Sequence, residues 1–265
     1  MLVAGCDVGS LTAKAVIVND RHIVANAVIR ATSRPEESAR KVMDMALSQA
    51  GLTFQDLAYV VGTGYGRRQI PFVNEVVSEI VCHGKAAQWL NPSIRMVIDV
   101  GGQDAKAIRV DETGAITRYV YNDKCASGTG RFLEIMAEAL EVALEDLGEL
   151  ALASKKPVSI SNQCTVFAET EVVSLLNNGK AIPDIACGLV RAMAHRIASL
   201  AKGIGLEPDI TMSGGVAKNQ GMFSALEEVL GVEIKRLDGD PQLNGALGAA
   251  LLGELAMRNH DSLKQ

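Results

Sequence analysis

Two short segments hold the residue types with the clearest chemistry. Residues 6–14 read CDVGSLTAK, and residues 98–106, which begin 92 positions later, read IDVGGQDAK. Each places Asp-Val-Gly at the end of an apolar run and a lysine seven positions beyond the aspartate. A repeat at matched spacing predicts two related halves of one chain that meet at a cleft, each with a β-hairpin whose turn follows the aspartate.

The chemistry expected of such a turn is phosphate binding. Glycine lets the backbone approach a ligand and direct N–H groups at phosphate oxygens, and the carboxylate can hold a hydrated Mg²⁺ ion. Two such hairpins can bind a polyphosphate from opposite sides. We expect Asp7 and Asp99 to hold Mg²⁺ through its waters, with Ser10, Thr12 and Lys14 on the phosphates.

Two further residues of the second copy are assigned by their chemistry. Gln103 can orient an attacking water, so Asp99 and Gln103 are the expected catalytic residues. Asp104 is a weaker candidate because it can simply cap the turn, and Lys106 is interpreted as a solvated strand residue.

A third glycine cluster, SGGVA at residues 213–217, follows a predicted strand and precedes a predicted helix. The free N–H groups of a helix start favour the phosphate or ribose of a nucleotide, although an ordinary tight turn has the same pattern. Competing nucleotide motifs are excluded: the P-loop pattern is missing, and GTGYG at residues 62–66 does not fit the dinucleotide fingerprint.

Five cysteines form no CxxC pair, which leaves a zinc ribbon or a ferredoxin-type cluster within one chain without support. Cys125 and Cys164 each lie directly before a predicted helix. The positive end of the helix dipole lowers the pKa of a thiol there, and the resulting thiolate is a better ligand for iron. Two ligands cannot complete a four-cysteine site, which predicts a symmetric homodimer with the site on its two-fold axis. Cys6, Cys82 and Cys187 fit the commoner role of small core residues.

Apolar runs rich in Val and Ile alternate with stretches of helical period, which indicates an α/β chain. Strands are expected at 2–8, 13–18, 23–29, 59–62, 95–100, 105–110, 116–121, 157–161, 209–213 and 232–236. Helices are expected at 35–50, 74–90, 130–140, 165–177, 182–204, 216–230 and 242–257. The expected lobes are residues 1–92 plus 243–265, which hold the first phosphate loop, and residues 93–242, which hold the second loop, the cysteine pair and the glycine turn.

The bulk composition excludes several classes of protein. A net charge of −5 with scattered Lys and Arg gives no basic footprint for nucleic acid. The apolar runs are too short to span a bilayer, and the N-terminus lacks the pattern of a signal peptide. We expect a cytoplasmic protein with no nucleic-acid or membrane partner.

The two Asp-x-Gly hairpins and the late glycine turn resemble the superfamily of actin, the Hsp70 chaperones and sugar kinases. Further segments narrow the resemblance: NDKCASGTGRF at 122–132, CTVFAETEV at 164–172 and NGALGAA at 244–250. With residues 97–106 they look like the activator component of 2-hydroxyacyl-CoA dehydratases, and more loosely like the ATP-binding subunits of benzoyl-CoA reductases. The resemblance covers nearly the whole chain.

This resemblance implies a two-lobed actin/Hsp70/sugar-kinase-like α/β fold, built on a duplicated ribonuclease H-like core. It implies one 4Fe-4S cluster per homodimer, bridged through Cys125 and Cys164, together with ATP/ADP and Mg²⁺. A low-potential electron from ferredoxin or flavodoxin would be driven by ATP hydrolysis into a partner 2-hydroxyacyl-CoA dehydratase or related reductase. The resemblance implies that Gly214, Gly215 and Gln242 line the nucleoside end. The full set of expected ATP-binding residues is Asp7, Gly9, Ser10, Leu11, Thr12, Ala13, Lys14, Gly101, Gly102, Gln103, Gly214, Gly215 and Gln242.

Two alternatives with the same fold stay open on the sequence. In a sugar or metabolite kinase, Asp99 would be the general base for a substrate hydroxyl, and the protein would carry no cluster. A non-catalytic assembly module related to actin would polymerise with ATP. Neither explains the residues around Cys125 and Cys164.

Overall fold

The computed structural model describes residues 1–161 and 164–262, which divide into two compact units. The first unit comprises Met1–Arg95, Val110–Thr117 and Leu237–Gln265, and the second comprises Met96–Arg109 and Arg118–Arg236. This division differs from the expected lobes in residues 93–95, 110–117 and 237–242, which group with the first unit.

The first unit is built on a five-stranded mixed sheet. Its strands are β1 (Leu2–Val8), β2 (Thr12–Asn19), β3 (His22–Arg30), β4 (Tyr59–Thr63) and β5 (Glu75–Val76), in the order β3-β2-β1-β4-β5. β1 pairs antiparallel with β2 and parallel with β4, so both edges of this central strand are satisfied. Its residues from Val3 to Val8 are all buried, as expected for a strand covered on both faces.

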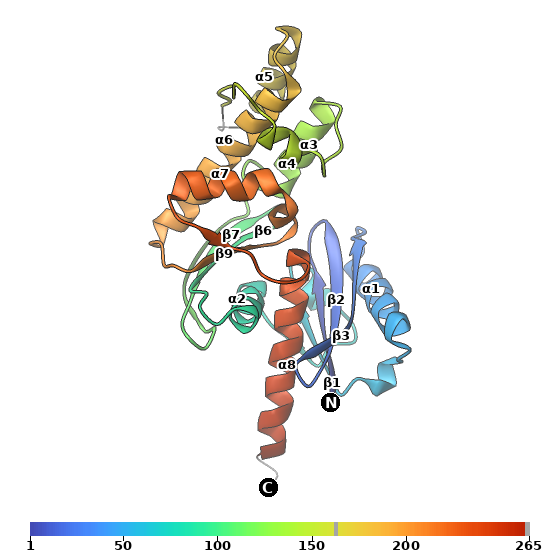
Figure 1. Cartoon of the computed structure of the whole chain (residues 1–265). Coiled ribbons are helices and arrows are strands. Elements are labelled where there is room, and N and C mark those ends of the chain that lie inside the picture. Colours follow the sequence, from blue (N-terminus) through green and yellow to red (C-terminus); the bar gives the residue numbers. More distant parts are fainter. Residues whose placement is uncertain (162–163, 263–265) are drawn as a thin grey trace. The chain divides into compact units, whose positions relative to one another are not determined.

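Helices cover the two faces of this sheet. α1 (Pro35–Ala50) packs on one face, whereas α2 (Glu79–Leu90) and α8 (Asn244–Ser262) pack together on the other (Figure 1). Alternation along β1 divides the core accordingly, because Ala4 and Cys6 face α1 while Val3 faces α8.

The second unit repeats the same sheet. Its strands are β6 (Met96–Val100), β7 (Ala105–Val110), β8 (Ile116–Asn122), β9 (Ile210–Ser213) and β10 (Ile234–Lys235), in the order β10-β9-β6-β7-β8. β6 pairs antiparallel with β7 and parallel with β9, which matches β1 with β2 and β4. The internal duplication seen in the two Asp-Val-Gly segments therefore extends to whole sheets.

The remaining helices complete the second unit, and their apolar faces form one core with β6. They are α3 (Gly130–Ala139), α4 (Leu147–Leu152), α5 (Thr165–Asn177), α6 (Ile182–Gly203) and α7 (Gln220–Leu230). Single 3₁₀ turns lie at η1 (Phe54–Asp56), η2 (Arg67–Gln69), η3 (Gly215–Lys218) and η4 (Pro241–Leu243). None of the helices within the described ranges has the length and hydropathy of a membrane span.

The strand expected at 157–161 is wrong, because these residues form irregular backbone. Their N–H groups are bonded to helices instead of to a sheet. Val158 N–H donates to the Asp184 carbonyl (3.2 Å), and Ser161 N–H donates to Glu171 Oε2 (2.8 Å). The short helix α4 was not predicted.

Three expected helices begin later than predicted. Residues 75–76 pair with β4 as β5, so α2 starts only at Glu79. Asn219 ends η3 and caps α7, since its side chain accepts from Met222 N–H (3.0 Å). Asp240 likewise accepts from Gln242 N–H (2.9 Å) and starts η4, after which α8 begins at Asn244.

The packing of α8 on α2 leads to a first testable prediction. A Cβ at Gly248 would collide with the backbone of Cys82 on the facing helix. Backbone cannot swing aside as a side chain does, so Gly248→Ala is expected to destabilise the protein by about 2–3 kcal/mol. The measurement is the shift of the denaturation midpoint in urea.

Gly203 provides the matched control, since it ends α6 with no atom within 4 Å of a Cβ. Gly203→Ala should leave the midpoint unchanged or raise it slightly, because alanine favours the helix. Equal midpoints for Gly248→Ala and wild type would contradict the close approach of α2 and α8.

Candidate functional site

The first hairpin places Asp7 at the end of β1 and closes with a Gly9 N–H to Thr12 carbonyl bond of 3.0 Å. Asp7 and Lys14 are cross-strand partners, and Lys14 Nζ lies 3.2 Å from Asp7 Oδ2. Both side chains are largely buried. Ser10 is exposed at the tip of the turn.

Two predicted ATP-binding residues of this hairpin have side chains that are partly or wholly buried. Ala13 is fully buried in the core beneath α1. Leu11 is half-buried, and its carbonyl accepts from Ala31 N–H (2.9 Å), which ties the turn to the end of β3.

The second hairpin repeats this geometry in the second unit. Gly101 N–H bonds the Asp104 carbonyl (2.9 Å), and Asp99 is the cross-strand partner of Lys106. Lys106 Nζ lies 3.3 Å from Asp99 Oδ2 and 2.5 Å from Asp104 Oδ2. Gln103 is exposed at the turn, where its amide is free to face a ligand.

The interpretation of Lys106 as a solvated strand residue is wrong. Its side chain is only 5% exposed and forms ion pairs with two carboxylates. Burying one ammonium beside two carboxylates leaves a net negative charge at the hairpin, and such a charge favours a cation. Asp104 is thereby part of the charged cluster and does more than cap a turn.

A parallel strand places a hydroxyl residue opposite each aspartate. Thr63 on β4 lies opposite Asp7, and Ser213 on β9 lies opposite Asp99. Ser213 Oγ donates to Asp99 Oδ1 (2.9 Å), which fixes that carboxylate from the side away from Lys106. Thr63 Oγ1 is buried without a hydrogen-bond partner within the described residues.

Each hydroxyl residue is followed by a glycine in the left-handed region, Gly64 at φ +87° and Gly214 at φ +85°. A Cβ at either position would collide with the neighbouring aspartate carboxylate and with the carbonyl after it. Sequence reasoning missed Gly64, because GTGYG was tested only as a dinucleotide fingerprint. The available signal was its match to Ser213-Gly214-Gly215 at the end of an equivalent strand.

The predicted nucleoside residues occupy two turns. Gly214 follows β9 as the N-cap of η3 and Gly215 begins η3, in line with the strand and turn expected around the glycine cluster. Gln242 lies in the first unit, within η4.

The turn of the second hairpin is bonded to the start of α3. Gly130 N–H donates to the Gly101 carbonyl (2.8 Å), and Arg131 N–H donates to the Gly102 carbonyl (2.8 Å). The free N–H groups of the first helical turn thus find partners in the hairpin. The segment that carries Cys125 leads directly into this helix.

Cys125 does not lie directly before a helix as predicted, because Thr129 is the N-cap residue of α3. Its Sγ instead lies 3.1 Å from Ser127 Oγ. Hydrogen bonding from the Ser127 side chain holds the pKa of the Cys125 thiol below its ordinary value, against the opposing effect of partial burial. Asn122 Nδ2 donates to the Cys125 carbonyl (2.9 Å) and fixes the segment.

Cys164 does lie directly before a helix, as the N-cap residue of α5, and its side chain is half-buried. The first turns of α5 expose apolar side chains beside it: Val166 is 64% exposed and Phe167 67% exposed. Val173, two turns further, is also exposed. Large apolar groups gathered on one helix are typical of a surface that another protein covers.

The other three cysteines fit the core role predicted for them. Cys6 and Cys82 are fully buried, and burial raises the pKa of the Cys82 thiol to about 12. Burial raises the pKa of Cys6 as well, and the Asp7 carboxylate adds to the effect. Cys187 packs against the core of the second unit from α6.

These observations define what one chain offers to an iron-sulfur cluster. Cys125 and Cys164 are the partly exposed cysteines outside the apolar cores. Within the described residues, no group of three or more His, Cys, Asp or Glu side chains converges on one point. One chain thus presents Cys125 and Cys164 as two partly exposed thiols, fewer than the four that a four-cysteine cluster needs.

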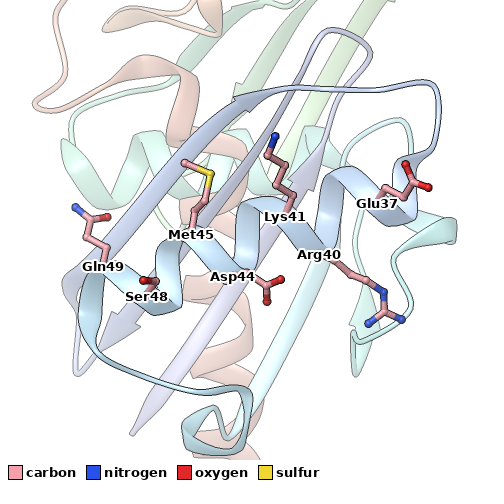
Figure 2. A pocket seen from close by; sticks show the side chains of 7 residues that line it. All are labelled: Glu37, Arg40, Lys41, Asp44, Met45, Ser48 and Gln49. Carbon is pink, nitrogen blue, oxygen red and sulfur yellow. The ribbon is translucent and has the colours of Figure 1, made fainter.

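The outer face of α1 carries a shallow hollow lined by Glu37, Arg40, Lys41, Asp44, Met45, Ser48 and Gln49 (Figure 2). It is a groove between exposed side chains of one helix, and no residue of either hairpin lines it. We assign it no role in nucleotide binding.

The sequence profile of the BadF/BadG/BcrA/BcrD ATPase family matches residues 4–253. The chain belongs to this ATPase family. The match spans both hairpins, the glycine turn and the two cysteine segments, and it confirms the predicted resemblance and the prediction of an ATPase.

Similar family members are activators of dehydratases. The chain is 44% identical over 251 residues to the activator of lactoyl-CoA dehydratase of Anaerotignum propionicum, covering 95% of this chain and 96% of that protein. It is 45% identical over 249 residues to the (R)-2-hydroxyglutaryl-CoA dehydratase activating ATPase of Acidaminococcus fermentans, covering 93% and 95%.

Solved structures confirm the predicted fold class. The activator of the 2-hydroxyisocaproyl-CoA dehydratase from Clostridium difficile with bound ADPNP superposes with a TM-score of 0.94 at 39% identity, covering 99% of this chain and 98% of that one. A ROK hexokinase from Thermus thermophilus superposes at 0.51 with 16% identity, covering 98% and 100%, which shows the shared fold alone.

Proposed function

We propose that the chain is an ATP-dependent activator. ATP hydrolysis on its two hairpins would drive a low-potential electron into a partner 2-hydroxyacyl-CoA dehydratase or a related acyl-CoA reductase. The dehydratase activators at 44% and 45% identity support this assignment over nearly the whole chain. The observation that carries it is the cysteine pair, because Cys125 and Cys164 are partly exposed while Cys6 and Cys82 are sealed in the core.

ATP would be bound by the predicted residues of the hairpins. Asp7 and Asp99 hold Mg²⁺ through its waters, and the buried cluster around Lys106 supports a cation there because its net charge is negative. Lys14 and the turn around Gly9 contact the phosphates, and Gln103 orients the attacking water. Gly214, Gly215 and Gln242 line the nucleoside end.

Cys125 and Cys164 would hold half of a 4Fe-4S cluster, and a second copy of the chain would supply the other half. When bound, the cluster stores and releases one electron at low potential. The exposed Val166 and Phe167 beside Cys164 support a homodimer, because a two-fold interface would remove both from water. A small redox protein such as ferredoxin or flavodoxin would donate the electron, under anaerobic conditions.

The hydrogen bonds from the Gly101–Gly102 turn to the start of α3 suggest how the nucleotide acts on the cysteines. A change in the turn when the γ-phosphate leaves would move Gly130 and Arg131, which are bonded to it at 2.8 Å. The segment of residues 126–129 is short, and its two ends are hydrogen-bonded, because Thr129 Oγ1 donates to the Ala126 carbonyl (2.7 Å). Displacement of α3 would therefore reposition Cys125.

Anaerobic purification of the wild-type protein tests the proposal. After reconstitution we expect about two irons per chain, because a four-iron cluster held by four cysteines would be shared by two chains. The mass in solution should be that of a dimer, and ATP should alter the absorption spectrum where ADP does not. Iron-free protein that hydrolyses ATP and phosphorylates a sugar would support the kinase alternative.

A further inference from the structure

The loop Gly64-Tyr65-Gly66 is fixed tightly against the first hairpin. Gly64 lies so close to Asp7 and Val8 that a Cβ would collide with both. Gly66 N–H donates to the Val8 carbonyl (2.8 Å), which pins the other side of the loop. Arg67 donates to the Gly64 carbonyl (2.9 Å) and is held in turn by Glu79 (2.9 Å).

This rigid loop holds an aromatic ring out in solvent. Tyr65 is 89% exposed, the largest exposed fraction among the large apolar side chains of the described residues. A side chain that touches so little contributes little to folding. Gly64 lets the backbone approach the carboxylate of Asp7, and Gly66 lets it approach the side chains of Val8 and Pro35, so specific contacts set the position of Tyr65 beside the hairpin.

The duplicated fold shows that this position differs between the two halves. Gly64 and Gly214 occupy equivalent places after β4 and β9. The next residue is Tyr65 in the first unit and Gly215 in the second. The second unit therefore leaves this place open, whereas the first fills it with a long side chain that ends in a hydroxyl donor.

We infer that the Tyr65 hydroxyl donates a hydrogen bond to a γ-phosphate oxygen of bound ATP. The inference rests on the proposed function, which assigns the Asp7 hairpin to the phosphates. Asp7 would hold Mg²⁺ through its waters, and the ion would supply positive charge to the terminal phosphates of the nucleotide. The loop contacts the Asp7 carboxylate through Gly64, which would place it at the phosphate end of the nucleotide, and the exposed Tyr65 is the loop residue with a hydroxyl to donate. Tyr65 thereby distinguishes ATP from ADP.

Tyr65→Phe tests this, since it removes the hydroxyl alone. With Mg²⁺ present, the affinity for a non-hydrolysable ATP analogue should fall about tenfold to hundredfold, the effect of one hydrogen bond to a charged group. The affinity for ADP should stay within about twofold of wild type, because ADP has no γ-phosphate. Thermal stability should not change, since the hydroxyl is in solvent.

Tyr119→Phe is the matched control, because Tyr119 is a half-exposed tyrosine on β8 that stacks on Tyr121. It should bind both nucleotides as wild type does. An unchanged ratio of ATP to ADP affinity in Tyr65→Phe would overturn the inference, whether both affinities stay normal or both fall together.

Lys14→Ala separates this inference from the proposed function. If it weakens both nucleotides, the hairpin binds phosphate, and the Tyr65→Phe ratio alone decides the inference. If it weakens neither, the phosphate assignment of the hairpin fails, and the role of Tyr65 fails with it. Iron content and dimer mass should be normal in Tyr65→Phe, so they report only on the cluster proposal.

Discussion

Alanine at either Cys125 or Cys164 is expected to abolish iron binding and electron delivery while leaving ATP binding intact. In a site shared across a two-fold axis each substitution removes two ligands of four, because both copies carry it. Two remaining thiolates do not hold a four-iron cluster. Iron per chain after anaerobic reconstitution is the direct measurement, and nucleotide affinity shows that the fold survives.

Cys187→Ala is the matched control for this loss. Cys187 is also partly exposed, but it packs on the core from α6. The variant should retain full iron and its absorption near ~400 nm, the region of thiolate-to-iron charge transfer. Full iron retention in both Cys125→Ala and Cys164→Ala would contradict the proposed cluster, and retention in one alone would mean that another residue is the second ligand in each chain.

The parts of the site that the sequence predicted are those formed by neighbours in the chain. In each hairpin the aspartate, turn and lysine lie within eight residues, so spacing alone predicted the two hairpins, although it did not predict the Asp99–Lys106 ion pair. Local patterning also located α1 and α5, whose observed bounds equal the predicted ones. The hydroxyl residues and glycines that β4 and β9 place beside the two aspartates could not be found this way, because parallel pairing joins segments far apart in sequence.

The incorrect predictions arise where hydrogen bonds or ion pairs, some local and some distant in sequence, override the pattern. Residues 157–161 carry the composition of a strand, but Val158 N–H donates to the Asp184 carbonyl of α6 and Ser161 N–H donates to the Glu171 carboxylate of α5. Lys106 follows the alternation of a strand, but Asp104 and Asp99 hold its ammonium inside. The pKa of Cys125 was expected to be lowered by a helix start, whereas the Ser127 side chain two residues away lowers it, a local turn contact that helix periodicity does not reveal.

Asp99→Asn is expected to slow ATP hydrolysis by about 100-fold to 1,000-fold, the effect of losing one preorganised group at a reacting phosphate. The amide matches the carboxylate in shape, so Ser213 can still bond to it. Lys106 also keeps its 2.5 Å pair with Asp104, so the substitution leaves no buried charge without a partner. A loss of rate can therefore be traced to the charge that holds the metal. The measurement is phosphate release at saturating ATP, with Mg²⁺ varied.

Asp111→Asn is the control, because Asp111 is a carboxylate at the β7–β8 turn that accepts from neighbours within its own turn, Thr113 and Ala115. It should hydrolyse ATP at the wild-type rate.

If Asp99 acts through hydrated Mg²⁺, the Asp99→Asn variant should lose kcat more than ATP affinity and should need more Mg²⁺ for half-maximal rate. A normal Mg²⁺ requirement with a lost rate would instead make Asp99 a base for the attacking group, as the kinase alternative requires. The same variant thus separates the two functions that the duplicated hairpins allow.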